Sequence, residues 1–197
     1  MKQIVVLTLV SLLIANPSWA GFAEAVAAYK RGDYATALRE WRPIADQGHA
    51  SVQYNMGVMY ANGLGVRQDD EVAAQWLAKA ANKGYPQAQY AFGLMYSHGR
   101  GVPRDYGKAV GLLSPLAEEG VDDAQYVMGV MHENGGGVPQ DFLHAYKWYN
   151  LAASKGNKRA LKARDNLAVR MTIGDISSAQ RLSREWLSAF KQRRRPQ

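Results

Sequence analysis

Residues 52–84 read VQYNMGVMYANGLGVRQDDEVAAQWLAKAANKG, and this stretch decides the fold because it returns twice. At a spacing of 36 residues it recurs as AQYAFGLMYSHGRGVPRDYGKAVGLLSPLAEEG at 88–120 and as AQYVMGVMHENGGGVPQDFLHAYKWYNLAASKG at 124–156. Of the 33 columns, 11 are identical in all three copies, without an insertion or a deletion. A fixed period of this length indicates a stacked array in which each copy packs against its neighbours.

Each copy predicts a pair of helices joined by a tight loop. In the first copy the apolar residues of the first half follow an i, i+3, i+4 pattern, and this helix is expected to end near Gly63. The Gly-x-Gly-Val loop then turns the chain, because glycine reaches positive φ at little cost. Asp69 is expected to cap the second helix by accepting hydrogen bonds from free backbone N–H groups, and Gly84 to close it.

A glycine also recurs inside the first helix of every copy. It costs about 1 kcal/mol relative to alanine at such a position. Its recurrence predicts a close backbone approach to a neighbouring helix, where a Cβ would not fit. The three glycines are Gly57, Gly93 and Gly129.

The combined pattern resembles a known family. Ala-Gln-Tyr-x-x-Gly-x-Met-Tyr, Gly-x-Gly-Val-x-x-Asp and Ala-x-x-Trp-x-x-x-Ala-Ala-x-x-Gly are similar to the Sel-one-like repeat (SLR) family, a branch of the tetratricopeptide (TPR) superfamily. The resemblance covers about residues 22–170, with small departures such as His132 in place of tyrosine. It implies an all-α fold, an α/α superhelical solenoid of TPR/SLR-type helix pairs with a C-terminal capping helix.

Residues 1–20 have the pattern of a signal peptide. Lys2 precedes an apolar run at 4–14, and the small residues Ser18 and Ala20 follow it, so cleavage is expected after Ala20. The run of 11 residues is shorter than the roughly 20 that a spanning helix needs, which disfavours the alternative of an uncleaved membrane anchor. These features predict an exported protein, periplasmic or secreted, without a transmembrane span after cleavage. The sequence has no cysteine, so disulfides play no part in the fold.

The rest of the chain divides into a repeat domain at 21–170 and a C-terminal segment at 171–197. The domain comprises a shortened repeat at 21–48, the three full copies and a partial copy at 157–170. The C-terminal segment predicts an amphipathic helix at about 175–191, followed by a basic tail. This helix is expected to cover the open end of the array. The alternative is that it docks on a partner or a membrane surface.

Charge is unevenly distributed along the chain. Residues 21–154 contain 11 basic and 14 acidic residues, whereas residues 155–197 contain 12 basic and 3 acidic residues. The basic end could contact anionic envelope polymers, lipid head groups or an acidic partner, and the alternative is a solvated tail. Nucleic acid is not expected, because the predicted export argues against it and the basic block lacks interleaved aromatic residues. The candidates for anionic contact are Lys191, Arg193, Arg194 and Arg195.

The sequence offers little for catalysis. Its four histidines form no His-Glu-x-x-His pair, so neither a metal nor a cofactor is expected. Ser188 and Lys191 match the Ser-x-x-Lys of penicillin-binding enzymes and β-lactamases, but the companion Ser-Asp-Asn and Lys-Thr-Gly motifs are absent. We therefore expect a protein that is not an enzyme.

Binding is the remaining class of function. Arrays of this kind present an extended groove, which in TPR relatives is lined mostly by first helices. Tyrosine recurs there in every copy, and it could serve either the groove or the core. Positions that vary between copies are the better candidates for specificity. The candidate groove residues are Tyr54, Asn55, Tyr90, Ser97, His98, Tyr126, Glu133 and Asn134.

The sequence therefore predicts a non-enzymatic, exported helical-repeat protein. It would bind another protein or a peptide as an adaptor or scaffold in the cell envelope. Two alternatives stay open at this point. One is a cell-wall or β-lactam hydrolase, and the other is a binder of anionic envelope polymer through the basic C-terminal end.

Overall fold

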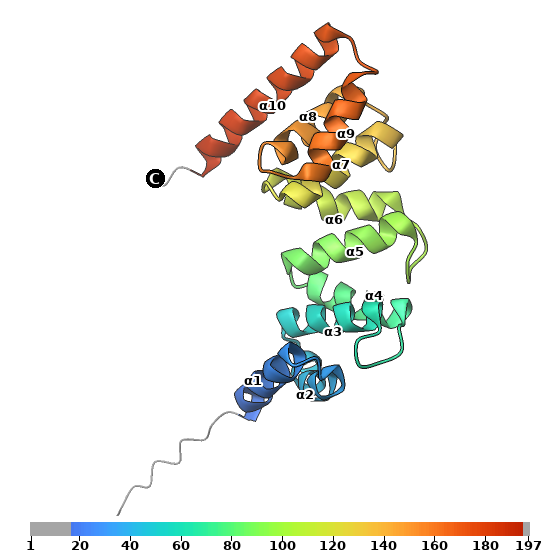
Figure 1. Cartoon of the computed structure of the whole chain (residues 1–197), viewed down its shortest axis with the longest axis vertical. Helices are drawn as coiled ribbons and strands as arrows, with labels where there is room; N and C mark the ends of the chain where they lie inside the picture. The colour runs from blue at the N-terminus through green and yellow to red at the C-terminus, as the bar shows by residue number, and fades with distance from the viewer. Residues whose placement is uncertain (1–16, 195–197) are drawn as a thin grey trace, which may run out of the picture.

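The computed structural model describes residues 17–194, in which every element is a helix. The expected signal peptide lies outside the described residues except for 17–20, where the first helix begins, and Arg195 also lies outside them. The helices stack along the long axis of the molecule (Figure 1). They are α1 Pro17–Lys30, α2 Tyr34–Asp46, α3 Ala50–Asn62, α4 Asp70–Ala81, α5 Pro86–His98, α6 Tyr106–Glu118, α7 Asp122–Asn134, α8 Phe142–Ala153, α9 Lys158–Ala168 and α10 Ile173–Arg193.

The three full copies form the helix pairs α3–α4, α5–α6 and α7–α8, and α1–α2 forms a pair before them. The second helix of each pair packs against the first helix of the next, so that α4 contacts α5 and α6 contacts α7. Buried residues form clusters that run from one pair into the next. The predicted all-α solenoid is confirmed.

The helix ends follow from the residues that the copies share. Asn62 ends α3, and Gly63 adopts the left-handed conformation with φ 65°. The Asp69 side chain accepts hydrogen bonds from the N–H groups of Glu71 (3.0 Å) and Val72 (2.9 Å), as expected for the start of α4. This helix ends at Ala81, three residues before Gly84, because the last turn tightens into bonds between residues three apart.

The second glycine of each Gly-x-Gly loop touches the preceding helix pair. A Cβ built on Gly101 would lie 2.0 Å from the carbonyl oxygen of Asp70, in the first turn of α4. A Cβ on Gly65 would lie 2.4 Å from the backbone of Tyr34, and one on Gly137 would lie 2.6 Å from that of Tyr106. These loops therefore do more than turn the chain. They bring the backbones of successive repeats into direct contact.

Polar side chains also connect successive repeats. Gln125 is buried in α7, and its Nε2 donates a hydrogen bond of 3.1 Å to the carbonyl of Ala117 in α6. Lys155 donates from its Nζ to the carbonyl of Gly120, in the turn after α6. Two equivalent bonds stand earlier in the array, from Gln53 to Ala45 (2.9 Å) and from Lys83 to Gly48 (2.5 Å). A buried donor that finds a backbone carbonyl in the preceding repeat favours one register of stacking.

The glycines inside the first helices leave no room for a Cβ, as predicted, but the nearest neighbour is a side chain and not, as expected, the backbone of a neighbouring helix. A Cβ on Gly129 would lie 2.5 Å from the ring of Tyr149, and one on Gly57 would lie 2.7 Å from Cγ of Leu77. In each case the neighbour is a buried side chain on the second helix of the same pair. The missing Cβ therefore leaves room for a large side chain within the hairpin.

This geometry predicts opposite effects of one substitution at two helical glycines. Gly111 lies inside α6, and no atom lies within 4 Å of the position that its Cβ would take, so Gly111→Ala should stabilise the protein by about 1 kcal/mol. Gly129→Ala has the same helical gain but must displace the Tyr149 ring, at a cost of about 1–3 kcal/mol. Urea unfolding followed by circular dichroism should rank Gly111→Ala above wild type and Gly129→Ala below it. Stabilisation by both would contradict the packing.

The C-terminal helix α10 begins with a capping box between Thr172 and Asp175 and packs against α8. Trp186 Nε1 donates a hydrogen bond of 2.6 Å to Oε2 of Glu118 at the end of α6, and its ring lies 6.0 Å from that of Trp148. The expected capping helix thus covers the second helices of the last two full repeats instead of extending the stack beyond α9 (Figure 1).

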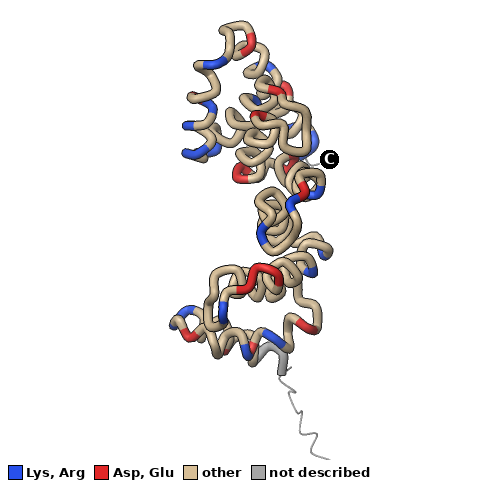
Figure 2. The backbone as a smooth tube through the Cα atoms, turned by 90° about the vertical axis from the view of Figure 1, so that its right-hand side faces the viewer, with Lys and Arg blue, Asp and Glu red and all other residues tan. Residues whose placement is uncertain are grey.

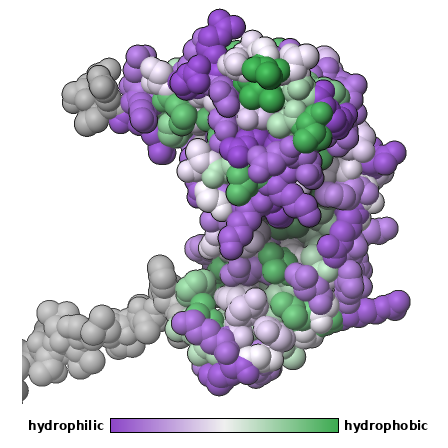
Figure 3. Space-filling model, turned by 45° about the horizontal axis from the view of Figure 1, so that its top comes forward, coloured by the Kyte–Doolittle hydropathy of each residue, from purple (hydrophilic) through white to green (hydrophobic). Residues whose placement is uncertain are grey.

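The turn between α9 and α10 is the most exposed apolar part of the described chain. Val169 is 84% exposed and Ile173 is 86% exposed. Figure 3 brings this end of the molecule forward and shows green patches within a mostly hydrophilic surface.

Candidate functional site

A groove of about 440 Å³ lies between the first helices α5 and α7. Its apolar wall is formed by Leu94, Val127, Val130 and Met131. Polar groups and the loop after α7 complete the lining, together with Arg159 of α9. A second groove of about 390 Å³ lies along α5, between Tyr54 of α3 on one side and the end of α6 and start of α7 on the other, and it shares Tyr90 and Leu94 with the first. Because they share these two residues, the two grooves adjoin, and we refer to them together as the channel.

The recurring tyrosines line this channel and are half-buried. They also pack against the core clusters, so each of them borders the channel and the core at once. Burial raises the pKa of Tyr54. Burial also raises the pKa of Tyr90. The negative charge of Asp123 raises this pKa further, whereas the positive charge of Arg159 lowers it. Both phenols therefore stay neutral near pH 7 and can donate or accept a hydrogen bond.

The structure brings most of the predicted groove residues together. The larger groove is lined by Tyr90, Ser97, His98, Tyr126 and Asn134, and the adjoining groove by Tyr54. Two candidates line neither groove, namely Asn55 and Glu133. The Glu133 carboxylate instead accepts a hydrogen bond of 2.8 Å from the Tyr149 hydroxyl and pairs with Arg170 at 2.7 Å.

Sequence reasoning did not identify Arg159, Leu94, Val130 or Tyr106 as groove residues. The apolar ones look like ordinary core positions of a helix. Arg159 lies in the partial last copy, and its guanidinium carbon is 4.4 Å from the centroid of the Tyr126 ring. The sequence did contain a sign that Arg159 could be a specificity residue, because its position differs between copies. The residues at this position are Ser51, Gln87, Asp123 and Arg159.

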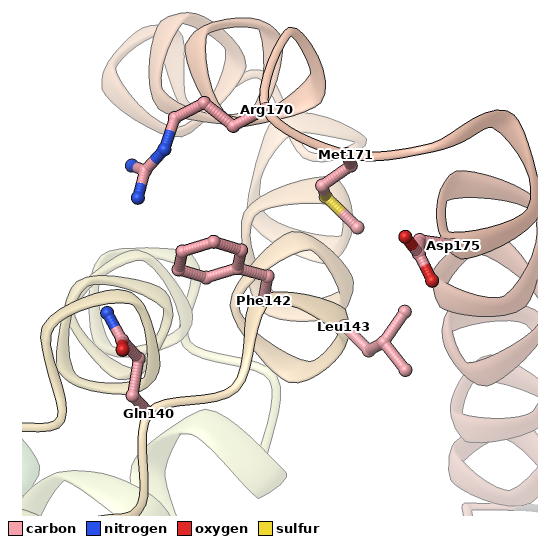
Figure 4. Close-up of a pocket in the computed structure, with 6 residues that line it drawn as sticks. All are labelled: Gln140, Phe142, Leu143, Arg170, Met171 and Asp175. Atoms are coloured by element: carbon pink, nitrogen blue, oxygen red, sulfur yellow. The ribbon is translucent and has the colours of Figure 1, made fainter.

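A smaller hollow of about 270 Å³ lies between the start of α8 and the turn after α9 (Figure 4). Its charged groups already have partners within the protein. Arg170 pairs with Glu133 and lies 4.5 Å from the centroid of the Phe142 ring, while Asp175 belongs to the capping box of α10. The hollow is therefore a weaker candidate than the channel.

Two histidines stack beside this end of the array. The rings of His132 and His144 are 5.3 Å apart, and Nδ1 of His144 is 2.7 Å from the Asp141 carboxylate. Burial and the neighbouring His144 lower the pKa of His132. Within residues 17–194, no three histidine, aspartate or glutamate side chains gather closely enough to hold a metal ion.

The basic C-terminal end is exposed as far as the structure describes it. Lys191, Arg193 and Arg194 all lie on the surface, with Arg193 3.9 Å from the Glu118 carboxylate and Arg194 5.0 Å from the centroid of the Phe190 ring. In Figure 2 a separate group of basic residues lies along the upper left edge of the molecule, on the opposite side of that view from the C-terminus. Ser188 is exposed on α10, and no hydrogen bond between it and Lys191 occurs in the described part of the chain.

No described helix combines the length and the apolar character of a membrane span.

Comparison with known proteins identifies one family and two similar solved structures. The model of the Sel1 repeat matches residues 50–85, 86–121 and 122–157. A protective antigen present in uropathogenic Escherichia coli strains, which displays an SLR fold, matches with a TM-score of 0.77 and 27% identity over 91% of this chain. A Sel1 repeat protein from Oxalobacter formigenes matches with a TM-score of 0.64 and 34% identity over 71% of this chain.

The matches cover only part of the two solved structures, 41% of the antigen and 57% of the Oxalobacter protein. No curated protein matches the chain.

Proposed function

The chain belongs to the Sel1 repeat family, and from this premise we propose that it is a scaffold that binds a protein or peptide through the channel along its first helices. Sel1-repeat proteins are generally protein-interaction scaffolds and typically non-catalytic. The observation that supports this site is the clustering of groove candidates from two successive repeats around an apolar wall. Such a surface offers apolar area and hydrogen-bonding groups to an extended segment.

We further propose that the protein acts after export, as an adaptor in the periplasm or outside the cell. The support is the signal-peptide pattern of residues 1–20. A stable scaffold there needs no disulfide, because stacking of the repeats buries a continuous apolar core.

Filling the groove should abolish partner binding without unfolding the array. Asn134 is exposed at the end of α7 and lines the groove, so Asn134→Trp places a large side chain in it. Gln75→Trp is the matched control, because Gln75 is exposed on α4 and lines neither groove. We expect affinity capture from an envelope extract, with identification by mass spectrometry, to recover partners with wild type and Gln75→Trp but not with Asn134→Trp. An unchanged set of partners would reject the groove as the binding site.

A second candidate is contact with an anionic polymer through the basic end, which is supported by the exposure of Lys191, Arg193 and Arg194. The variant Asn134→Trp also separates the two candidates. Retention on immobilised heparin should be unaffected by Asn134→Trp if the basic end acts by itself. The hydrolase alternative has no comparable observation in its favour, because the exposed Ser188 has no activating partner among residues 17–194.

A further inference from the structure

One position of the repeat places its side chain beside the tyrosine of the preceding copy. In α9 this position is Arg159, which lies over the Tyr126 ring in the larger groove. In α7 it is Asp123, which lines the adjoining groove with Tyr90 and acts electrostatically on that tyrosine. In α5 it is Gln87, in the same groove as Tyr54. We call these residues the variable column; they are Gln87, Asp123 and Arg159.

The charges of this column are available to a ligand. Arg159 is exposed and makes neither an ion pair nor a hydrogen bond with any residue in the range 17–194. Asp123 is exposed as well, and the only bond to its carboxylate within this range comes from the Asn157 amide at 3.1 Å. The channel therefore has an unpaired cation in its larger groove, from Arg159, and a carboxylate without an ion-pair partner in the adjoining groove, from Asp123 of the repeat before it.

The apolar surroundings make these charges selective. An ion pair formed against an apolar wall is screened less than one in open water, and juxtaposed like charges disfavour the wrong partner. The tyrosines are the same in each copy and offer the same surface, so they cannot distinguish one end of a ligand from the other. The variable column changes from neutral to negative to positive along the channel, and this change can set both the sequence and the direction of a bound segment.

We propose that the variable column selects an extended segment of a partner protein that carries an acidic side chain beside Arg159 and a basic side chain beside Asp123. The proposal rests on the proposed function and adds the charge pattern of the partner. Complementarity to the two unpaired charges is the reason for choosing a segment with both signs over a uniformly acidic or uniformly apolar one.

Selection from a library of displayed random 12-residue peptides tests the proposal. Four proteins are used as bait: wild type, the groove-filling Asn134→Trp, Arg159→Glu and Lys158→Glu. The last is the matched control, because Lys158 precedes Arg159 on α9, is exposed, carries the same charge and lies outside both grooves. Wild type and Lys158→Glu should enrich peptides that combine an acidic with a basic residue. Arg159→Glu should enrich peptides in which a basic residue replaces the acidic one.

Binding of one selected peptide then gives the size of the effect. By fluorescence anisotropy, Arg159→Glu should bind the wild-type peptide about three- to tenfold more weakly, and exchange of the acidic residue of the peptide for lysine should restore binding. Asp123→Lys should show the reciprocal preference at the basic residue of the peptide.

Each other outcome has a distinct meaning. An identical consensus for wild type and Arg159→Glu would overturn the charge selection and leave groove binding intact. Equal effects of Lys158→Glu and Arg159→Glu would show a general effect of net charge and would also overturn it. If no peptide distinguishes wild type from Asn134→Trp, the groove does not bind peptides, and the proposed function fails together with the inference.

Discussion

Replacement of Gly101 by alanine should destabilise the array by about 2–5 kcal/mol. Gly101 has a φ of 67°, where an L-residue costs about 1–2 kcal/mol. Its new Cβ would also lie 2.0 Å from the carbonyl oxygen of Asp70, and because this neighbour is backbone, it cannot rotate away. Overpacking of this kind costs a further 1–3 kcal/mol, roughly. Urea unfolding followed by circular dichroism measures the loss.

Gly84→Ala is the control for the backbone conformation alone. Gly84 has a φ of 76°, but a Cβ added there would meet no atom within 4 Å. Gly84→Ala should therefore lower the stability only by the cost of a left-handed backbone conformation, about 1–2 kcal/mol. Equal losses in the two variants would show that the Gly-x-Gly loop serves only to turn the chain and that its contact with the preceding repeat does not matter.

The second large effect is expected at Trp186, with a loss of about 3–5 kcal/mol on exchange for alanine. The indole is buried, contacts the Trp148 ring and donates its N–H to Glu118, so it connects α10 to both α8 and α6. Without it α10 should detach from the array. Limited trypsin digestion should then cleave at Arg181 and Arg184, which lie in α10.

Glu185→Ala controls for a change in α10 that leaves its packing intact, since Glu185 is the exposed neighbour of Trp186. It should keep both the stability and the protease resistance of wild type. If Trp186→Ala also resists trypsin, the helix is held by its other contacts, and the assigned role of the indole is wrong.

The predictions from sequence that the structure confirms are those with a local cause. The helix pairs, the left-handed Gly63 and the aspartate cap of α4 follow from the conformational preferences of a few adjacent residues. The lack of space for a Cβ at the glycines inside the first helices was also predictable. Glycine lowers helix stability, so its recurrence in every copy implies a structural need common to all of them. Most of the groove candidates lie in the channel because first helices repeat at a fixed spacing and so expose corresponding faces.

The remaining features depend on contacts between residues far apart in the chain. Arg159 meets Tyr126 across 33 positions, and Trp186 meets Glu118 across 68. No single copy contains both members of either pair, so no local pattern identifies such pairs. Glu133 shows the reverse case. Its position varies between copies, as that of a specificity residue would, but its carboxylate already binds Tyr149 and Arg170 within the protein.

By itself the sequence determined the repeating hairpin and the all-α solenoid, because caps, glycines and helical periodicity act over a few residues. Only the tertiary structure decided where α10 lies, how the Gly-x-Gly loops contact the preceding repeat and which charges stand beside the tyrosines. The physical reason is that these features arise when separate hairpins pack together. Packing depends on shape and charge complementarity between surfaces that the linear order does not bring together.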